Sequence, residues 1–260
     1  MEVRIGKYQL HYGEEPCISG TRGSGTVFFS GCNMRCVFCQ NAPISHHGKG
    51  RQYTVEELSD IFRELEDKGA HNINIVTGSV WADRIIEAFK LYRPSIPVVW
   101  NSSGYETVET LKKLEEYVDV YLPDYKYEDS SLAFNFSGRR DYPEVAGDAI
   151  REMLRQKGNP VFDEDGIIQK GVIIRHLVLP LHLKNSESVI ANFRRHFGDA
   201  WVSLMLQYTP VIHSDEYPEL NRTLTKRECE KITGLLSDSG IENGYIQDIS
   251  AAVPDLIPDF

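Results

Sequence analysis

Three of the chain's five cysteines lie within the eight residues from Cys32 to Cys39, in the spacing Cys-x3-Cys-x2-Cys. They follow the apolar run Thr-Val-Phe-Phe at 26–29, which is β-branched and aromatic and therefore predicts a buried strand. The cysteines are thus expected on a loop that leaves a strand. Three thiols so close together cannot all pair as disulfides. Soft sulfur ligands on one loop can instead converge on a zinc ion or an iron–sulfur cluster.

The number of cysteines bears on what such a centre can do. A cubane cluster has four irons, so three cysteines leave one iron open for a ligand that is not protein. An open iron indicates chemistry rather than electron storage alone. The alternative is a structural zinc site in which His46 or His47 completes a Cys3His set. A disulfide or reactive-cysteine interpretation fits poorly, because clustered cysteines in a chain without a signal sequence do not match a disulfide framework.

Length and composition limit the fold and the partners. With 260 residues and 41% hydrophobic content, the chain has the size of one α/β barrel domain. The formal net charge of −10 argues against nucleic acid as a partner, because such a surface needs clustered Lys and Arg. No stretch approaches the roughly 20 apolar residues of a membrane helix, and the start lacks a secretory signal. We therefore expect a cytoplasmic protein with reduced cysteines and no membrane partner.

Strand and helix patterns alternate along the chain. Capping boxes at Thr54 and Thr225 open two amphipathic helices. The predicted strands lie at 26–29, 72–76, 97–100, 118–122, 171–179 and 201–206, with helical stripes between them. We expect 127–142 to be irregular and 159–166 to form a polar loop. About six β–α units predict an α/β fold with parallel strands, a partial (β/α)6 TIM-type barrel, with a doubly wound flat sheet as the alternative.

The expected division of the chain follows from this pattern. Residues 1–25 are rich in glycine and predict a short strand or irregular N-terminal cover segment. Residues 26–250 would form the barrel core, and residues 251–260 a C-terminal tail.

Polar residues gather where the predicted strands end, which is where parallel α/β folds place their sites. They occur at 32–41, 77–79, 101–104, 124–126 and 207–209. Arg175 and His176 lie within the fifth strand, where alternation allows only one of them to face the interior. We favour Arg175, because its planar fork can bond both oxygens of a carboxylate. His176 is then expected to be a satisfied core or interface histidine.

The segment from Arg22 to Asn41, which contains Gly-Cys-Asn-Met-Arg-Cys-Val-Phe-Cys-Gln-Asn, resembles the radical S-adenosylmethionine (SAM) superfamily. More narrowly, it is similar to proteins related to pyruvate formate-lyase activating enzyme. The resemblance implies that Cys32, Cys36 and Cys39 hold a [4Fe-4S] cluster whose open iron binds the amino and carboxylate groups of SAM. It also implies a partial (β/α)6 barrel, and reduced flavodoxin or ferredoxin as the electron donor.

The resemblance further assigns residues to SAM. The segment 77–79 takes the place of a Gly-Gly-Glu-Pro segment that binds the methionyl amine in many relatives, but the glutamate is absent here. Phe38 matches an aromatic that packs near adenine, with an ordinary packed aromatic as the alternative. Asp124 and Lys126 match the Asp-x-Lys segment of glycyl-radical activating enzymes, with a surface ion pair as the alternative. The expected SAM contacts are Phe38, Thr77, Gly78, Ser79, Asn101, Ser102, Asp124, Lys126, Arg175 and Gln207.

These inferences predict a radical SAM enzyme that cleaves SAM reductively and uses the 5′-deoxyadenosyl radical to abstract hydrogen from a substrate. A glycyl residue of a partner enzyme is one candidate substrate, although the chain lacks the cysteine-rich insert of archetypal activases. A small metabolite or another peptide side chain is the alternative. A non-catalytic zinc or iron–sulfur module, or a plain electron carrier, is disfavoured because neither needs polar residues at successive strand ends.

Overall fold

Seven parallel strands form the centre of the sheet in the computed structural model, which describes residues 2–247 and 260. In order across the sheet they are β2 (Ser24–Phe29), β4 (Ile73–Val76), β5 (Val98–Ser102), β6 (Val120–Pro123), β8 (Ile168–Leu177), β9 (Trp201–Met205) and β10 (Gly244–Gln247). Beyond β2, the strands β1 (Val3–His11) and β3 (Arg51–Tyr53) extend the sheet with antiparallel pairing. The short β7 (Val161–Phe162) pairs with β8.

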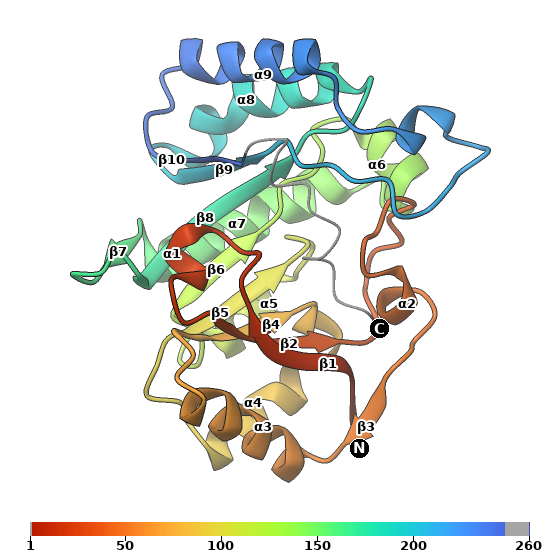
Figure 1. Ribbon diagram of the computed structural model, residues 1–260. Helices are drawn as coiled ribbons and strands as arrows, with labels where there is room; N and C mark the ends of the chain where they lie inside the picture. The colour runs from red at the N-terminus through yellow and green to blue at the C-terminus, as the bar shows by residue number, and fades with distance from the viewer. Residues whose placement is uncertain (1, 248–259) are drawn as a thin grey trace.

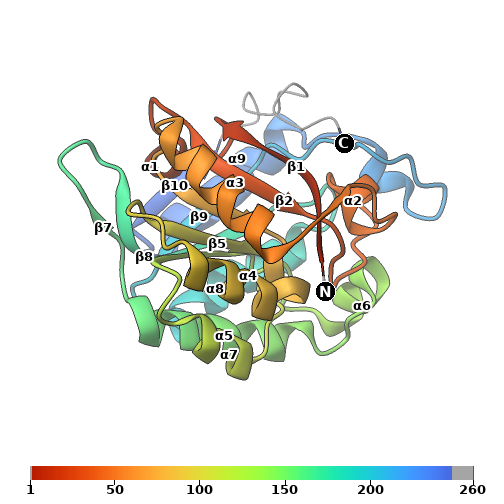
Figure 2. The same ribbon diagram turned by 90° about the horizontal axis from the view of Figure 1, so that it is seen from below.

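The order of the parallel strands follows the sequence without a reversal. Each successive parallel strand is added on the same side of the one before it. Because β–α–β crossovers are right-handed, every crossover helix then lies on the same face of the sheet. A doubly wound sheet would need a point where the order reverses. Figures 1 and 2 show the long helices on the outer side of a curved sheet. The fold is therefore the partial TIM-type barrel that the sequence predicts.

The crossover helices form where the hydrophobic stripes predict them. They are α3 (Val55–Asp67), α4 (Ala82–Leu91), α5 (Val108–Leu114), α7 (Tyr142–Lys157), α8 (Leu183–Phe197) and α9 (Lys226–Asp238). Both predicted capping boxes are confirmed, since Thr54 and Thr225 each exchange hydrogen bonds with the glutamate three residues later. In α3 the apolar stripe is buried, and each of its large side chains contributes roughly 1.5–3 kcal/mol by leaving water.

Short helical segments complete the described chain. They are α1 (Pro16–Ser19), α2 (Ala42–Ser45), α6 (Ser130–Ser137), η1 (Gly78–Trp81) and η2 (Pro218–Asn221). The expectation of an irregular stretch at 127–142 was wrong, because α6 forms there. Its signal is the cap: the Asp129 carboxylate accepts from the amides of Ser131 (2.7 Å) and Leu132 (3.1 Å).

Two strands also differ from the prediction. The loop expected at 159–166 contains β7, which pairs antiparallel with β8. β8 begins at Ile168, before the predicted start at 171. β10 adds a seventh parallel strand beside β9. Its sequence, Gly-Tyr-Ile-Gln, has little of the apolar character by which the other strands are recognised.

The inner side of the barrel is layered. Near the amino ends of the strands it is apolar, and Cys17 and Ile18 of α1 pack there against Val99, Val120 and Ile173. The N-terminal segment therefore supplies a strand, β1, and closes this end of the barrel. The division at 25 and 250 stays a prediction, since residues 248–259, most of the expected tail, lie outside the described residues.

Among the described residues, no helix combines the length and the apolar character needed to cross a membrane.

Candidate active site at the carboxyl ends of the strands

The cysteine loop begins at the carboxyl end of β2 and is tied to the chain that follows β6. The amide of Val37 donates to the carbonyl oxygen of Phe136 at 2.8 Å. The Arg139 guanidinium donates two hydrogen bonds, of 2.9 and 2.6 Å, to the carbonyl oxygen of Asn33. These contacts hold the loop backbone in place by protein interactions alone.

The three cysteines of the loop are buried to different degrees. Cys36 is 7% exposed, and Cys32 and Cys39 are half-buried. Burial raises the pKa of Cys36, and it raises the pKa of Cys32 to about 12. Thiolates at this position would therefore need a positive partner, and a bound metal centre is one.

The arrangement of donors bears on which metal group fits. Within residues 2–247 and 260, no three His, Cys, Asp or Glu side chains are grouped so that they could hold a metal ion. A cubane cluster is a larger body than one ion, so its three sulfur ligands stand farther apart than the ligands of one zinc. His46 and His47 are exposed and lie edge to face with each other, 6.4 Å between ring centroids. Three cysteines on one loop are the ligand type that a [4Fe-4S] cluster takes, and an exposed histidine would have to move in to complete a Cys3His zinc site.

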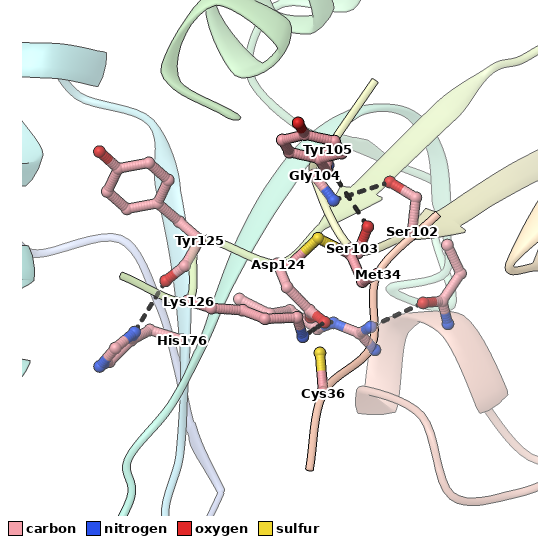
Figure 3. Close-up of polar contacts among 12 residues, drawn as sticks. Met34, Cys36, Ser102, Ser103, Gly104, Tyr105, Asp124, Tyr125, Lys126 and His176 are labelled. Atoms are coloured by element: carbon pink, nitrogen blue, oxygen red, sulfur yellow. Dashed lines mark hydrogen bonds and ion pairs between the residues drawn. The ribbon is translucent and has the colours of Figure 1, made fainter. Parts of the chain in front are cut away.

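A buried ion cluster lies beside the cysteine loop (Figure 3). The Asp124 carboxylate forms ion pairs with Lys126 and with Arg175, whose Nε lies 2.9 Å from Oδ1. All three side chains are only 13–14% exposed, so the alternative of a surface ion pair was wrong. Burial alone would raise the pKa of Asp124, but Arg175 and Lys126 outweigh it and hold that pKa below its usual value. Lys126 also acts electrostatically on Cys36.

Arg175 faces the barrel interior and His176 faces outward, as predicted. The His176 nitrogens bond the Tyr125 carbonyl oxygen and the Ser186 hydroxyl, each at 2.8 Å, in the layer between β8 and α8. Arg175 donates from Nε to Asp124 and from Nη2 to the Asn101 Oδ1 at 2.6 Å. Its Nη1 donates to a carboxylate that the sequence did not single out.

That carboxylate belongs to Glu14, 3.1 Å from the Arg175 Nη1. Its other oxygen accepts from the side-chain amides of Asn74 (3.2 Å) and Asn101 (3.0 Å). All three nitrogens of the Arg175 guanidinium thus have acceptors within the protein, so an added carboxylate would have to share or displace them. The only sequence signal at this point is a pair of adjacent glutamates before Pro16.

Gln207 and Phe38 occupy the borders of this region. The Gln207 amide bonds Gln247, whose amide in turn donates to the buried Glu15 carboxylate at 3.0 Å. Phe38 is 8% exposed and packs edge to face against Phe136 and Tyr208, with ring centroids 6.3 Å apart in both cases. These contacts make Phe38 part of an aromatic cluster, and its contact with adenine stays a prediction.

The loops after β4 and β5 meet at another buried carboxylate, that of Glu106. Ser79 and Ser102 both donate hydroxyl hydrogen bonds to Glu106, at 2.6 and 3.1 Å. Thr77, before the buried Gly78, adopts a left-handed backbone conformation with φ +61°. This conformation is strained for a β-branched residue, and such strain is often found at functional sites. No local pattern in the sequence singles out Glu106.

A tyrosine joins the loop after β5 to the loop after β6. The Tyr142 hydroxyl accepts from the Lys126 amide (3.0 Å) and lies 2.7 Å from the carbonyl oxygen of Asp124 and 2.8 Å from that of Ser103. Between these loops, Gly104 approaches the Asp124 backbone closely (Figure 3). The backbone around Asp124 is therefore fixed by its neighbours as well as by its ion pairs.

The fold and the cysteine loop together define a class, an α/β partial barrel with a three-cysteine loop after its first parallel strand. The family model described as the radical SAM superfamily matches residues 26–165, and the chain belongs to that superfamily. An uncharacterized protein of Methanocaldococcus jannaschii is 34% identical over 246 residues, which cover 91% of this chain and 68% of that protein. The pyruvate formate-lyase-activating enzyme of Clostridium pasteurianum is 22% identical over 78% of this chain and 82% of its own length.

Solved structures agree on the fold. The chain is similar to HydG, a maturase of the [FeFe]-hydrogenase, with a TM-score of 0.59 and 18% identity over 88% of this chain. It is also similar to Streptococcus suis SuiB bound to the precursor peptide SuiA, with a TM-score of 0.55 and 16% identity over 87% of this chain. The chain spans about half the length of each of these proteins, 53% and 49%.

Proposed function

We propose that Cys32, Cys36 and Cys39 hold a [4Fe-4S] cluster and that the polar strand ends beside it bind SAM. When bound, these groups supply reductive cleavage of SAM to methionine and a 5′-deoxyadenosyl radical that abstracts a hydrogen atom from the substrate. The observation that carries the proposal is the position of the cysteine loop beside the buried cluster of Asp124, Lys126 and Arg175. Membership of the radical SAM superfamily supports it.

The chain's own residues would bind and orient the nucleotide. Asp124 is held ionised and can accept hydrogen bonds from hydroxyl or ammonium groups, whereas Lys126 is a donor for a carboxylate. Both are nearly excluded from water, which strengthens their interactions with a charged ligand. Further contacts are proposed at Thr77, Gly78, Asn101 and Gln207, which lie at or just after the carboxyl ends of β4, β5 and β9, and at Phe38 on the cysteine loop.

For the substrate we propose a segment of another protein, of which a glycyl residue is one example. Glu14 and Glu15 occupy the inside of the barrel. A substrate would therefore approach from the open end of the barrel, at the carboxyl ends of the strands, and not through its interior. Relatives named pyruvate formate-lyase-activating enzymes support this class of substrate. We propose reduced flavodoxin or ferredoxin as the electron donor and the cytoplasm as the compartment.

The test is anaerobic reconstitution followed by incubation with SAM and dithionite. We expect 5′-deoxyadenosine from the wild type and none from Cys32→Ser, Cys36→Ser or Cys39→Ser, while Cys229→Ser on α9 stays active. Cleavage by a variant that lacks all three cysteines would refute the proposal. Peptides carrying deuterated glycine then test the substrate: transfer of deuterium into 5′-deoxyadenosine supports a protein substrate, and transfer only from small metabolites contradicts it.

A further inference from the structure

The surface around the cysteine loop is basic, although the chain as a whole is acidic. The chain has 38 Asp and Glu against 28 Lys and Arg, yet residues 16–55, which include the loop, contain four Lys or Arg and no Asp or Glu. Two further arginines lie between α6 and α7, on the segment to which the loop is tied. We define the basic surface as the exposed side chains of Arg35, His46, His47, Arg139 and Arg140.

Backbone contacts and a shared depression bring these side chains together at the loop. The Arg35 amide donates to the carbonyl oxygen of Ser137, the last residue of α6, at 3.3 Å. His46 and His47 come directly after α2, and Figures 1 and 2 show α2 and α6 on the same side of the molecule. Both histidines and Arg35 line a depression of about 590 Å³ to which Cys32 also contributes. A cluster held by the loop would therefore lie next to the basic surface.

The arginines of the basic surface have no carboxylate partners. Among the residues that the structure describes, none of Arg35, Arg139 and Arg140 forms an ion pair, and Asp141, which follows them, accepts from the Tyr105 hydroxyl at 2.9 and 3.0 Å. Several cations on the crossover helices do have such partners, as in the pairs Arg63–Asp60, Lys68–Glu64, Arg84–Glu87 and Arg151–Asp148. The positive charge of the basic surface is thus left for a partner from outside the chain.

An exposed aromatic side chain at the same place favours a protein as that partner. Phe134 on α6 is 49% exposed, and the Arg140 guanidinium lies over its ring, with Cζ 4.9 Å from the ring centroid. Aromatic and arginine side chains are enriched at protein interfaces. A small anion would use the charge but not this apolar contact.

The proposed reaction needs a partner of this kind. Reductive cleavage of SAM takes up one electron, while the bond between sulfur and the 5′ carbon breaks and methionine is released. The electron comes from outside the chain each time SAM is cleaved, so its donor has to bind, give up one electron and leave. Complementary charges suit such a brief contact, because they speed association and need only a small interface.

We propose that the basic surface is the docking site of the electron donor, a carrier protein whose redox group is surrounded by acidic side chains. The donor is oxidised by one electron at this surface, beside the cysteine loop. The inference rests on the proposed function, which creates the need for the electron.

Binding of an acidic flavodoxin to the anaerobically reconstituted protein tests the inference, measured by surface plasmon resonance. At about 20 mM salt we expect Arg140→Glu to weaken binding about fivefold or more, and His47→Glu to act in the same direction from the other side of the loop. Both effects should shrink at about 200 mM salt, where exposed charges are screened. The matched control is Arg195→Glu on α8, an exposed arginine that also lacks an ion pair among the described residues, and it should change binding less than about twofold.

The same proteins are then given SAM with either reduced flavodoxin or dithionite. Formation of 5′-deoxyadenosine by Arg140→Glu should slow with flavodoxin and stay unchanged with dithionite, because a small reductant needs no docking surface. Equal binding of flavodoxin by the wild type and Arg140→Glu, or an equal loss for Arg195→Glu, would overturn the inference. So would a variant that still binds flavodoxin but no longer takes deuterium from peptides, since the surface would then receive the substrate. If the wild type forms no 5′-deoxyadenosine with dithionite, the proposed function itself fails, so the two failures are distinguishable.

Discussion

Glu14 and Arg175 are separated by 161 residues in sequence, and their side chains form an ion pair of 3.1 Å inside the barrel. The two side chains are 10% and 13% exposed. The pair connects the N-terminal segment to the Asp124 cluster through one guanidinium. The segment before β2 therefore contributes charge to the candidate active site, in addition to covering the barrel.

We expect Glu14→Gln to destabilise the protein by about 3 kcal/mol, because removal of one partner leaves a buried charge less well compensated. The new amide has one oxygen, so its nitrogen would face either the Arg175 Nη1 or the amide nitrogens of Asn74 and Asn101, all of which are donors. Urea unfolding monitored by circular dichroism measures the change in the free energy of unfolding.

The matched control for this pair is the exposed pair of Arg194 and Asp199, whose side chains are 53% and 74% exposed. Asp199→Asn should change the free energy of unfolding by less than about 1 kcal/mol, because exposed ion pairs contribute little. Equal losses for Glu14→Gln and Asp199→Asn would show that burial of the Glu14 pair has no energetic consequence.

Some residues of the candidate site can be predicted from the sequence and others cannot, and this difference has a physical reason. The cysteine loop and the capping boxes are local patterns, so neighbouring residues suffice to predict them. Asp124 and Lys126 are found by their place at a strand end. Glu14 and Glu106 follow no pattern of their own, because each acquires its role only through contacts with residues that are distant in sequence.

The missed elements have related causes. α6 is short, and its start depends on a cap rather than on a clear apolar stripe. β10 is an edge strand with little apolar character, and it is defined by its pairing with β9. In both cases tertiary contacts decide the structure where local propensity is weak.

Gly104 is the point of closest approach between the loops after β5 and β6. Its φ is +75°, and a Cβ atom there would lie 2.2 Å from the carbonyl oxygen of Asp124. We expect Gly104→Ala to lower the free energy of unfolding by about 3 kcal/mol or more, since backbone strain and a clash with backbone add together. The urea midpoint of the variant measures the loss.

Gly138 separates the two contributions to this loss. Its φ is +68°, and a Cβ atom there would meet no other atom within 4 Å. Gly138→Ala should therefore show the strain alone, about 1–2 kcal/mol. If both substitutions cost the same, the close approach at Asp124 does not constrain the loop.

Cluster binding is expected to depend on the loop cysteines and not on the barrel cysteine. Cys17 is 2% exposed and packs in the apolar layer, where burial raises its pKa to about 11. After reconstitution we expect about four irons per chain for the wild type and for Cys17→Ala, and a large loss for Cys36→Ser. Iron and zinc are measured by mass spectrometry. One zinc per chain with no iron would support the structural zinc site instead.

His176 should make the folded protein sensitive to acid. It is 1% exposed, and burial lowers its pKa to about 4 from the ordinary 6.5, so it stays neutral in the folded chain while the unfolded chain takes up a proton. This contribution to stability is complete above pH 6.5 and is lost as the pH falls toward 4, by about 3 kcal/mol in total. Urea unfolding at pH 7 and at pH 5 measures this loss. Between the two pH values, the free energy of unfolding should decrease less for His176→Gln than for the wild type. His213→Gln, which replaces an exposed loop histidine, is the control, and its free energy of unfolding should decrease as much as that of the wild type. Equal decreases in all three proteins would contradict a neutral buried His176.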